Sequence, residues 1–172
     1  GDVYKRQGKT HVAKLFGCPV FNADQEVANL YKKNRTCFVK LKKILPKYIT
    51  SQPINKKMLL KAILDKNSNL KKITKIIHPQ VRLKMNRFVK KNKNKEIIVL
   101  DIPLLIENKL NAKNDILVFI DAKKREILKR LKKRPNFNLK MLHKLKALQL
   151  SLEVKKKKSN FIIKNNFRNS IV

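Results

Sequence analysis

The sequence has few of the residues that mark several large classes of protein. It contains two cysteines, three glycines, no tryptophan and only 11 acidic residues among 172. Cys18 and Cys37 lack metal-ligand spacing, so we expect two free thiols, not a disulfide framework or a zinc site. No apolar run approaches the roughly 20 residues that cross a bilayer, and the polar, charged start is unlike a secretory signal. We therefore expect a cytoplasmic protein with no membrane partner.

The excess of basic residues is large, with 44 lysines and arginines and a net charge of +33. Such a charge attracts polyanions. However, the lysines are spread over nearly every segment together with asparagine and isoleucine, which A/T-rich codons would produce without selection for binding. Aromatic residues make up only 6% of the chain, and no zinc-finger, RNP or bZIP pattern is present. We expect no specific nucleic-acid partner, although a basic nucleic-acid-binding domain stays open as an alternative function.

The pattern of apolar residues predicts an α/β fold. Strands are predicted at residues 20–21, 97–100, 115–122 and 161–163. Helices are predicted at residues 10–16, 25–31, 123–133 and 139–155. Because strands alternate with helices, the strands should form a parallel sheet with right-handed crossovers.

Residues 32–92 have helical spacing throughout and predict an all-helical insert. We expect Asn55 to cap the helix that ends at Leu64, because asparagine is favoured at that position. Pro79 falls inside the next helical pattern and is expected to kink or restart it.

Gly8, Lys9 and Thr10 precede a predicted helix and read like the end of a phosphate-binding loop. In such a loop backbone N–H groups face the phosphates, the lysine reaches the β- and γ-phosphates, and the threonine hydroxyl binds Mg²⁺. The full pattern also requires a glycine at position 3, where Val3 stands, and a strand before the loop. These residues alone leave open whether GKT is part of a nucleotide site or an accident.

Asp24 and Asp101 each fall at the carboxyl end of a predicted strand, where ligands collect in open α/β sheets. Asp24 could act as a general base toward a substrate hydroxyl, or it could cap the helix that follows. Asp101 could hold Mg²⁺, or it could simply end its strand. Local sequence leaves both alternatives open for each residue.

Basic residues with a possible role in phosphate binding follow the third strand. Arg125, Arg130 and Arg134 suit a lid that closes on a triphosphate, because guanidinium groups bind phosphate in a bidentate way. A lysine-rich helix face exposed to solvent would give the same sequence pattern. His78, beside Pro79, could contact substrate or have a structural role.

The order of these features is more specific than any one of them. GKT, FNAD, IIHPQVR, VLDIPLLIEN, ILKRLKKR, ALQ and SNFIIKN follow one another from Gly8 to about Phe167. This order resembles the dephospho-CoA kinase family, whose members transfer the γ-phosphoryl group of ATP to the ribose 3′-hydroxyl of dephospho-CoA in the last step of coenzyme A synthesis. The resemblance implies a three-layer P-loop kinase with a parallel sheet, a helical substrate-binding insert and a helical lid. Another small-molecule or nucleotide P-loop kinase remains the second enzyme alternative, against which the HP pair and PLLIE argue.

The resemblance also implies a division of the chain. Residues 8–31 and 93–172 correspond to the kinase core, with the lid at about 124–150, and residues 32–92 correspond to the dephospho-CoA-binding insert. The family begins with an apolar strand and a glycine-rich loop, and residues 1–7 match neither. We expect residues 1–7 to be a non-native leader and the central first strand to be largely missing. A chain without that strand is expected to be poorly stable or inactive.

The resemblance assigns roles to individual residues. The residues implied to bind ATP are Gly8, Lys9, Thr10, Arg130, Arg134 and Asn165. Those implied to bind dephospho-CoA are Asp24, His78, Pro79, Leu104 and Glu107. The catalytic residues are implied to be Asp24, as the base, with Lys9 and Arg134, while Thr10 and Asp101 would hold the cofactor Mg²⁺. The chain departs from the family at Asn22, where the first Asp of a DAD-like motif is usual, and at Ser159-Asn160, where Ala-Asp is usual.

Overall fold

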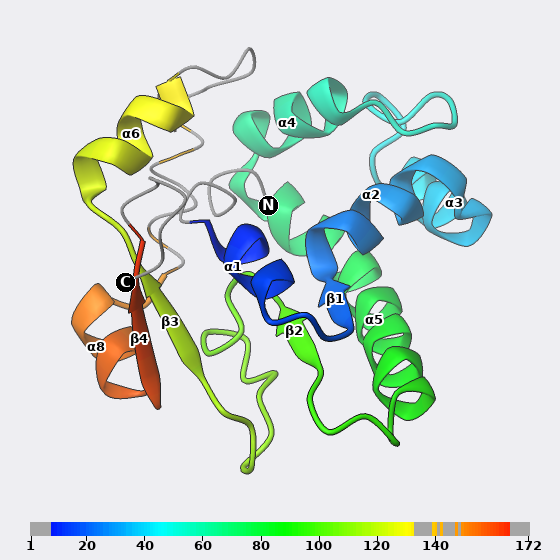
Figure 1. Ribbon diagram of the computed structural model, residues 1–172. Helices are drawn as coiled ribbons and strands as arrows, with labels where there is room; N and C mark the ends of the chain where they lie inside the picture. The colour runs from blue at the N-terminus through cyan, green and yellow to red at the C-terminus, as the bar shows by residue number, and fades with distance from the viewer. Residues whose placement is uncertain (1–7, 133–138, 141, 143–146, 148, 166–172) are drawn as a thin grey trace. The chain divides into compact units, whose positions relative to one another are not determined.

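The computed structural model describes residues 8–132, 139–140, 142, 147 and 149–165 (Figure 1). In chain order its elements are α1 (Lys9–Leu15), β1 (Val20–Asn22), α2 (Ala23–Lys33), α3 (Arg35–Ile44), α4 (Lys56–Asp65), α5 (Asn67–Lys91), β2 (Val99–Asp101), β3 (Val118–Asp121), α6 (Lys124–Lys132), α8 (Leu152–Lys157) and β4 (Phe161–Lys164). All four predicted strands are present, and the expected α/β alternation is confirmed. Arg134 lies outside the described residues.

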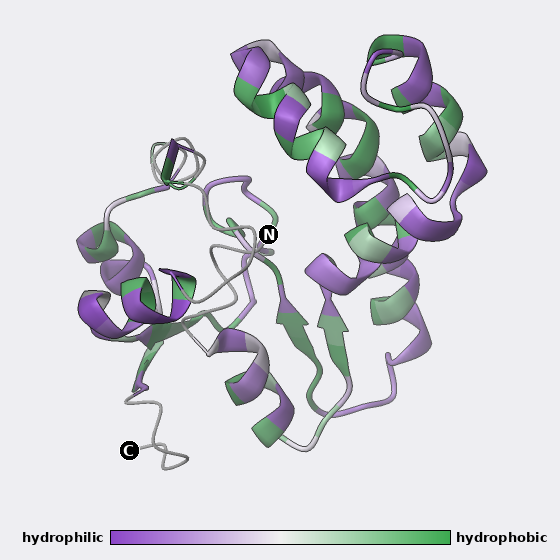
Figure 2. Cartoon of the chain, turned by 90° about the horizontal axis from the view of Figure 1, so that it is seen from above, coloured by the Kyte–Doolittle hydropathy of each residue, from purple (hydrophilic) through white to green (hydrophobic). Residues whose placement is uncertain are grey.

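The strands form two separate two-stranded sheets, β1–β2 and β3–β4. In the second sheet the strands are parallel, and their register runs from Val118 opposite Phe161 to Asp121 opposite Lys164. The arrows of β1 and β2 lie side by side and point the same way in Figure 2. The predicted parallel pairing is therefore confirmed. Within the described residues no strand pairs with both β2 and β3.

The chain divides into two compact units, which are described separately. One unit comprises Gly1–Gly17 and Asp101–Val172, and the other comprises Cys18–Leu100. The second unit thus contains β1, α2 and most of β2 in addition to the predicted insert 32–92, because α2 packs against α5. The expected division into a kinase core and a substrate-binding insert stays a prediction.

The core of the second unit forms around α5, which packs against α2, α3 and α4. Its most deeply buried large side chains are Leu30, Cys37, Leu41 and Ile49. Complete burial of an aliphatic side chain of this size contributes about 1.5–3 kcal/mol. Both cysteines are free thiols, as expected, and burial raises the pKa of Cys37.

Three helices of the second unit begin at asparagine residues. The side-chain oxygens of Asn22, Asn34 and Asn55 accept backbone N–H groups of the first turns of α2, α3 and α4, at 2.8–2.9 Å. The expected cap at Asn55 is confirmed. Helix α2 begins at Ala23, two residues before the predicted start at residue 25, because Asn22 is its N-cap.

Two further predictions about helices were wrong. Pro79 does not restart the helical pattern, because α5 runs without interruption from Asn67 to Lys91. Proline removes one helical hydrogen bond, and the packing of α5 against three other helices outweighs that loss. The predicted helix 139–155 is broken before Ser151, whose hydroxyl accepts the backbone N–H of Val154 and so begins α8.

Among the described residues, the first unit has a smaller set of buried apolar side chains than the second. They are Val12 and Ala13 of α1, Phe119 and Ile120 of β3, Leu131 of α6, and Leu142. In both units the helices carry apolar and polar residues on different sides, as the colours of Figure 2 show. No helix in the described part of the chain has the length and apolar character needed to span a membrane.

Candidate active site

Gly8 begins the candidate site with a backbone conformation that suits glycine. Its φ is 81° and its ψ is 10°, which is the left-handed region, and it occupies the N-cap position of α1. Glycine adopts this conformation without the steric cost that a Cβ atom would add. The Gly8 carbonyl accepts the N–H of Val12 at 2.9 Å. This geometry places Lys9 and Thr10 in the first turn of α1.

Thr10 and Asp101 meet although 91 residues separate them in the sequence. The Thr10 hydroxyl Oγ1 donates a hydrogen bond to Asp101 Oδ2 at 2.5 Å. Asp101 is the last residue of β2 and is only 8% exposed. A hydroxyl and a carboxylate oxygen side by side are the hard oxygen ligands that Mg²⁺ prefers. The two residues that the sequence proposed as metal ligands are therefore brought together.

A magnesium site of this kind does not need a cage of protein ligands. Mg²⁺ is usually held by one or two carboxylates, with water and substrate phosphates completing its octahedron. Among the described residues no group of three His, Cys, Asp or Glu side chains could hold a metal ion. The Thr10–Asp101 pair fits an ion that arrives with a nucleotide.

Asp24 lies in the first turn of α2, directly after β1, and is half-buried. The helix cap is Asn22, whose Oδ1 accepts the N–H of Gln25 at 2.8 Å. The capping role considered for Asp24 is thus filled by Asn22. Within the described residues the Asp24 carboxylate has no hydrogen bond or ion pair. Asparagine and aspartate are about equally good N-caps, so Asn22 serves where the family usually has an acid.

An ion pair attaches the first turn of α2 to α5. Lys84 Nζ lies 2.8 Å from Glu26 Oε2, with the two side chains 39% and 25% exposed. The rings of Phe21, just before α2, and Phe88, on α5, pack against each other with centroids 5.6 Å apart. A partly exposed ion pair contributes only about 0–1 kcal/mol. The apolar contacts therefore stabilise the position of α2, and the ion pair adds to its orientation.

His78 and Pro79 lie on the surface of α5 in the second unit. Partial burial of the imidazole lowers the pKa of His78, and the nearby Arg82 lowers it further. Both effects favour the neutral imidazole near pH 7, which can donate one hydrogen bond and accept another. The expected contact of His78 and Pro79 with dephospho-CoA stays a prediction.

The segment after Asp101 contains a leucine in a strained conformation. Leu104 has a φ of 57°, in the left-handed region that non-glycine residues rarely adopt. Its carbonyl accepts two hydrogen bonds from Asn108, from the backbone N–H at 3.0 Å and from the side-chain amide at 2.9 Å. Residues held in such conformations cluster at functional sites. This agrees with the role expected of Leu104, which nonetheless stays a prediction.

Glu107 has partners within the protein. Its Oε1 lies 2.8 Å from Lys155 Nζ and accepts the backbone N–H of Leu150 at 3.2 Å. No local sequence feature predicted these partners, because Lys155 begins a run of four lysines that is typical of a solvated charge cluster. The direct contact of Glu107 with substrate stays a prediction.

The remaining expected ATP-binding residues lie in the first unit. Arg130 is half-buried in α6. Asn165 follows β4, is 9% exposed, and donates its N–H to the Asp121 carbonyl at 2.7 Å. Asn160, which stands where the family usually has Asp, accepts the Leu117 N–H on its side-chain oxygen at 2.8 Å. An aspartate oxygen could accept the same bond, so the substitution retains this contact.

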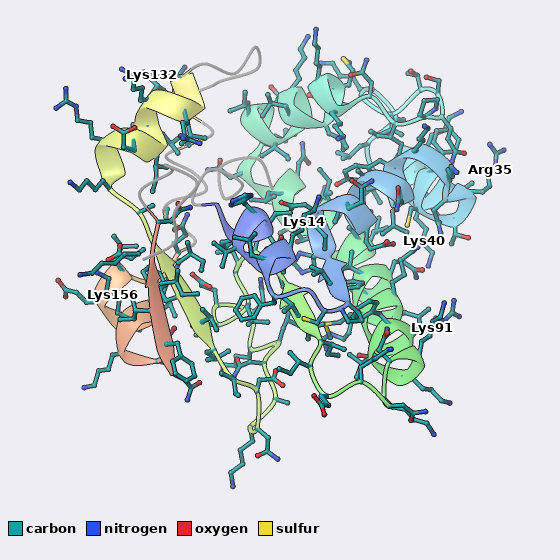
Figure 3. All side chains as sticks on the ribbon, viewed as in Figure 1. Lys14, Arg35, Lys40, Lys91, Lys132 and Lys156 are labelled. Carbon is teal, nitrogen blue, oxygen red and sulfur yellow. The ribbon has the colours of Figure 1, made fainter. Side chains whose placement is uncertain are left out.

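The basic side chains are distributed over many elements. Figure 3 labels such residues on α1, α3, α5, α6 and α8. The distribution agrees with the spread of lysine along the sequence and identifies no single basic element.

Comparison with known proteins decides the family. The family model for dephospho-CoA kinase matches residues 6–170. The chain belongs to the dephospho-CoA kinase family. It is 34% identical over 161 residues to the dephospho-CoA kinase of Wolbachia pipientis wMel and 31% identical to that of Bartonella quintana. Each alignment covers 91% of this chain and 82% of the relative.

Solved structures show the same fold. TT1252 from Thermus thermophilus is 21% identical, with a TM-score of 0.71, and the match covers 95% of this chain and 85% of that protein. The dephospho-CoA kinase from Campylobacter jejuni is 23% identical, with a TM-score of 0.58 and coverage of 94% and 82%. The predicted P-loop kinase fold is confirmed, and the family is one of nucleotide-binding phosphotransferases of coenzyme A synthesis.

Proposed function

We propose that this chain transfers the γ-phosphoryl group of ATP to the ribose 3′-hydroxyl of dephospho-CoA, giving coenzyme A and ADP. The observation that carries the proposal is the Thr10–Asp101 contact directly after Gly8 and Lys9. It joins the end of a phosphate-binding loop to an acid at the end of a strand, as a P-loop kinase requires. The family membership supports the same reaction.

Thr10 Oγ1 and Asp101 Oδ2 would hold a Mg²⁺ ion that accompanies ATP. When bound, that ion would neutralise charge on the β- and γ-phosphates. Lys9 would bind the same phosphates, and Arg130 and Arg134 would stabilise the charge on the transferred group. Phosphoryl transfer depends almost entirely on such positioning and electrostatic stabilisation.

Asp24 would be the general base. As the 3′-oxygen forms its bond to the γ-phosphorus, its proton passes to the Asp24 carboxylate, and the bond from the γ-phosphorus to the β–γ bridging oxygen breaks. The leaving electron pair stays on ADP. Two observations support this role. Asn22 caps α2, and no described residue forms a hydrogen bond or ion pair with the Asp24 carboxylate.

Dephospho-CoA would be bound through the helical insert 32–92, with His78, Pro79 and Leu104 as contacts. Asn165 would lie beside the adenine of ATP. The proposed partners are thus two small molecules, and the proposed location is the cytoplasm.

An ATP-consumption assay tests the proposed function. It should be run on the 172-residue chain and on a chimeric chain, in which the N-terminal segment of the Wolbachia pipientis relative replaces residues 1–7. We expect ADP release only when dephospho-CoA is added, with the phosphate on the 3′-oxygen by mass spectrometry and NMR. A folded chain that phosphorylates a nucleoside monophosphate and not dephospho-CoA would contradict the proposal.

Replacement of Asp101 by asparagine should raise the Mg²⁺ concentration needed for half-maximal activity. The amide keeps an oxygen for Thr10 but lacks the negative charge that attracts the cation. We expect at least about a tenfold rise, which is the effect of about 1.4 kcal/mol in binding. The measurement is a Mg²⁺ titration at constant ATP.

The control for this titration is Asp115→Asn, an exposed acid whose side chain accepts the backbone N–H of Ala112. It removes the same charge from the same unit of the chain, so it should leave the Mg²⁺ requirement nearly unchanged. Equal shifts in both variants would mean that the effect is one of general charge.

A further inference from the structure

Glu107, Lys155 and the backbone of Leu150 form a contact that we call the Glu107 latch. One carboxylate oxygen of Glu107 receives both the Lys155 ammonium group, at 2.8 Å, and the Leu150 N–H, at 3.2 Å. Lys155 Nζ also lies 3.3 Å from the side-chain oxygen of Gln149. The latch thus joins segments 43 residues apart in the sequence.

The latch is more enclosed than the other ion pairs of the described residues. The side chains of Lys155 and Glu107 are 14% and 10% exposed, whereas those of Lys156 and Asp121, in the next ion pair of α8, are 39% and 29% exposed. An enclosed pair has a fixed geometry and is weakly screened by salt. Loss of one partner leaves a charge without compensation in a poorly solvated place. A change at either residue should therefore move the segments that they join.

On one side the latch holds the segment that follows Asp101. Within this segment Leu104 has its left-handed conformation, supported by the two hydrogen bonds from Asn108. Glu107 lies between Leu104 and Asn108 in the same series of turns. The strained conformation of Leu104 persists only if its surroundings keep it in place.

The other segment that the latch contacts comprises the non-helical residues 149–151, which directly precede α8. In this segment the Leu150 N–H donates to Glu107 and the Ser151 hydroxyl caps α8. The same carboxylate oxygen therefore satisfies a backbone donor and fixes the start of the helix that carries Lys155. This explains why the chain leaves the helix that its apolar pattern predicts.

We propose that Glu107 and Lys155 are positioning residues for dephospho-CoA, which act through Leu104 and do not bind the substrate themselves. This inference rests on the proposed function. It gives Glu107 a role different from the direct substrate contact that the family resemblance implies. The two roles predict different effects of replacing Lys155 on kcat/KM for dephospho-CoA. Lys155 is the partner of Glu107 in the latch and has no expected substrate contact.

The experiment is a double-mutant cycle with Glu107→Gln, Lys155→Met and the double variant, in the 172-residue chain and in the chimeric chain. Steady-state kinetics should be measured well below the melting temperature of each variant. Each single substitution should lower kcat/KM for dephospho-CoA by about 10–100-fold, because small displacements of positioning groups have effects of that size. The double variant should be no worse than the worse single variant, and KM for ATP should change little.

Two further variants keep the test selective. Lys155→Arg retains a cation for Glu107 and should restore most of the activity that Lys155→Met loses. Lys157→Met makes the same chemical change at an exposed lysine of α8 and should leave both kinetic constants nearly unchanged.

The possible contrary outcomes are distinct. A large effect of Glu107→Gln with a small effect of Lys155→Met would mean that Glu107 binds dephospho-CoA directly. Lower melting temperatures with normal kcat/KM would mean that the latch is only structural. Either result overturns the inference and leaves the proposed function intact. In contrast, if neither folded chain without substitutions phosphorylated dephospho-CoA, the proposed function itself would be overturned.

Discussion

Asp24→Asn should lower kcat for phosphoryl transfer to dephospho-CoA by about 10²–10⁴-fold, which is the usual contribution of a general base. The amide has nearly the shape of the carboxylate but cannot accept the proton of the 3′-hydroxyl. Because Asn22 caps α2, the substitution should not disturb the start of that helix. Affinity for ATP should therefore remain nearly that of the parent chain. The measurement is single-turnover kinetics with both substrates saturating.

The matched control is Glu96→Gln, which removes a carboxylate from an exposed position of the same unit. This control should retain normal kcat, and both variants should have normal melting temperatures. Near-normal turnover in Asp24→Asn would exclude Asp24 as the base. An equal loss in the two variants would point to a general effect of charge.

Lys9→Ala should remove nearly all ATP-dependent activity, with a loss of at least about 10²-fold in kcat/KM for ATP. Lys9 lies in the first turn of α1, between the left-handed Gly8 and the Thr10 that contacts Asp101. In a phosphate-binding loop the ammonium group at this position binds the β- and γ-phosphates as charge develops in the transition state. The measurement is the rate of ADP release over a range of ATP concentrations.

Lys14→Ala provides the control, because Lys14 is an exposed lysine of the same helix (Figure 3). It makes the same change in net charge, so a purely electrostatic attraction of ATP would weaken equally in both variants. We expect Lys14→Ala to behave like the parent chain. Retained activity in Lys9→Ala would mean that the start of α1 is not the ATP site.

Several features of the fold could be predicted because they depend on local chemistry. The apolar runs at residues 20–21, 97–100 and 115–122 predicted strands, and a strand is present within or across each of them. Asn55 predicted a helix start because its amide oxygen competes well for the N–H groups of a first turn. The order of the motifs gave the family, since that order carries information that no single motif has.

Other features could not be predicted because they depend on contacts between distant segments. Local sequence predicted that Pro79 kinks or restarts the helix, but α5, which packs against α2, α3 and α4, does not restart there. Apolar spacing gave one helix over residues 139–155, but hydrogen bonds from Leu150 to Glu107 and from Val154 to Ser151 break it. In both cases a tertiary contact outweighed local propensity, which differs by less than about 1 kcal/mol among most residues and by about 3 kcal/mol for proline in a helix interior.

The sequence by itself determined the family, the α/β alternation and the identity of the candidate site residues, because these follow from residue type and order along the chain. Only the tertiary structure showed that Thr10 touches Asp101, that Asn22 and not Asp24 caps α2, and that one lysine of the KKKK run pairs with Glu107. Hydrogen bonds and ion pairs act over about 3 Å, and residues 91 positions apart come within that distance only when the chain is folded.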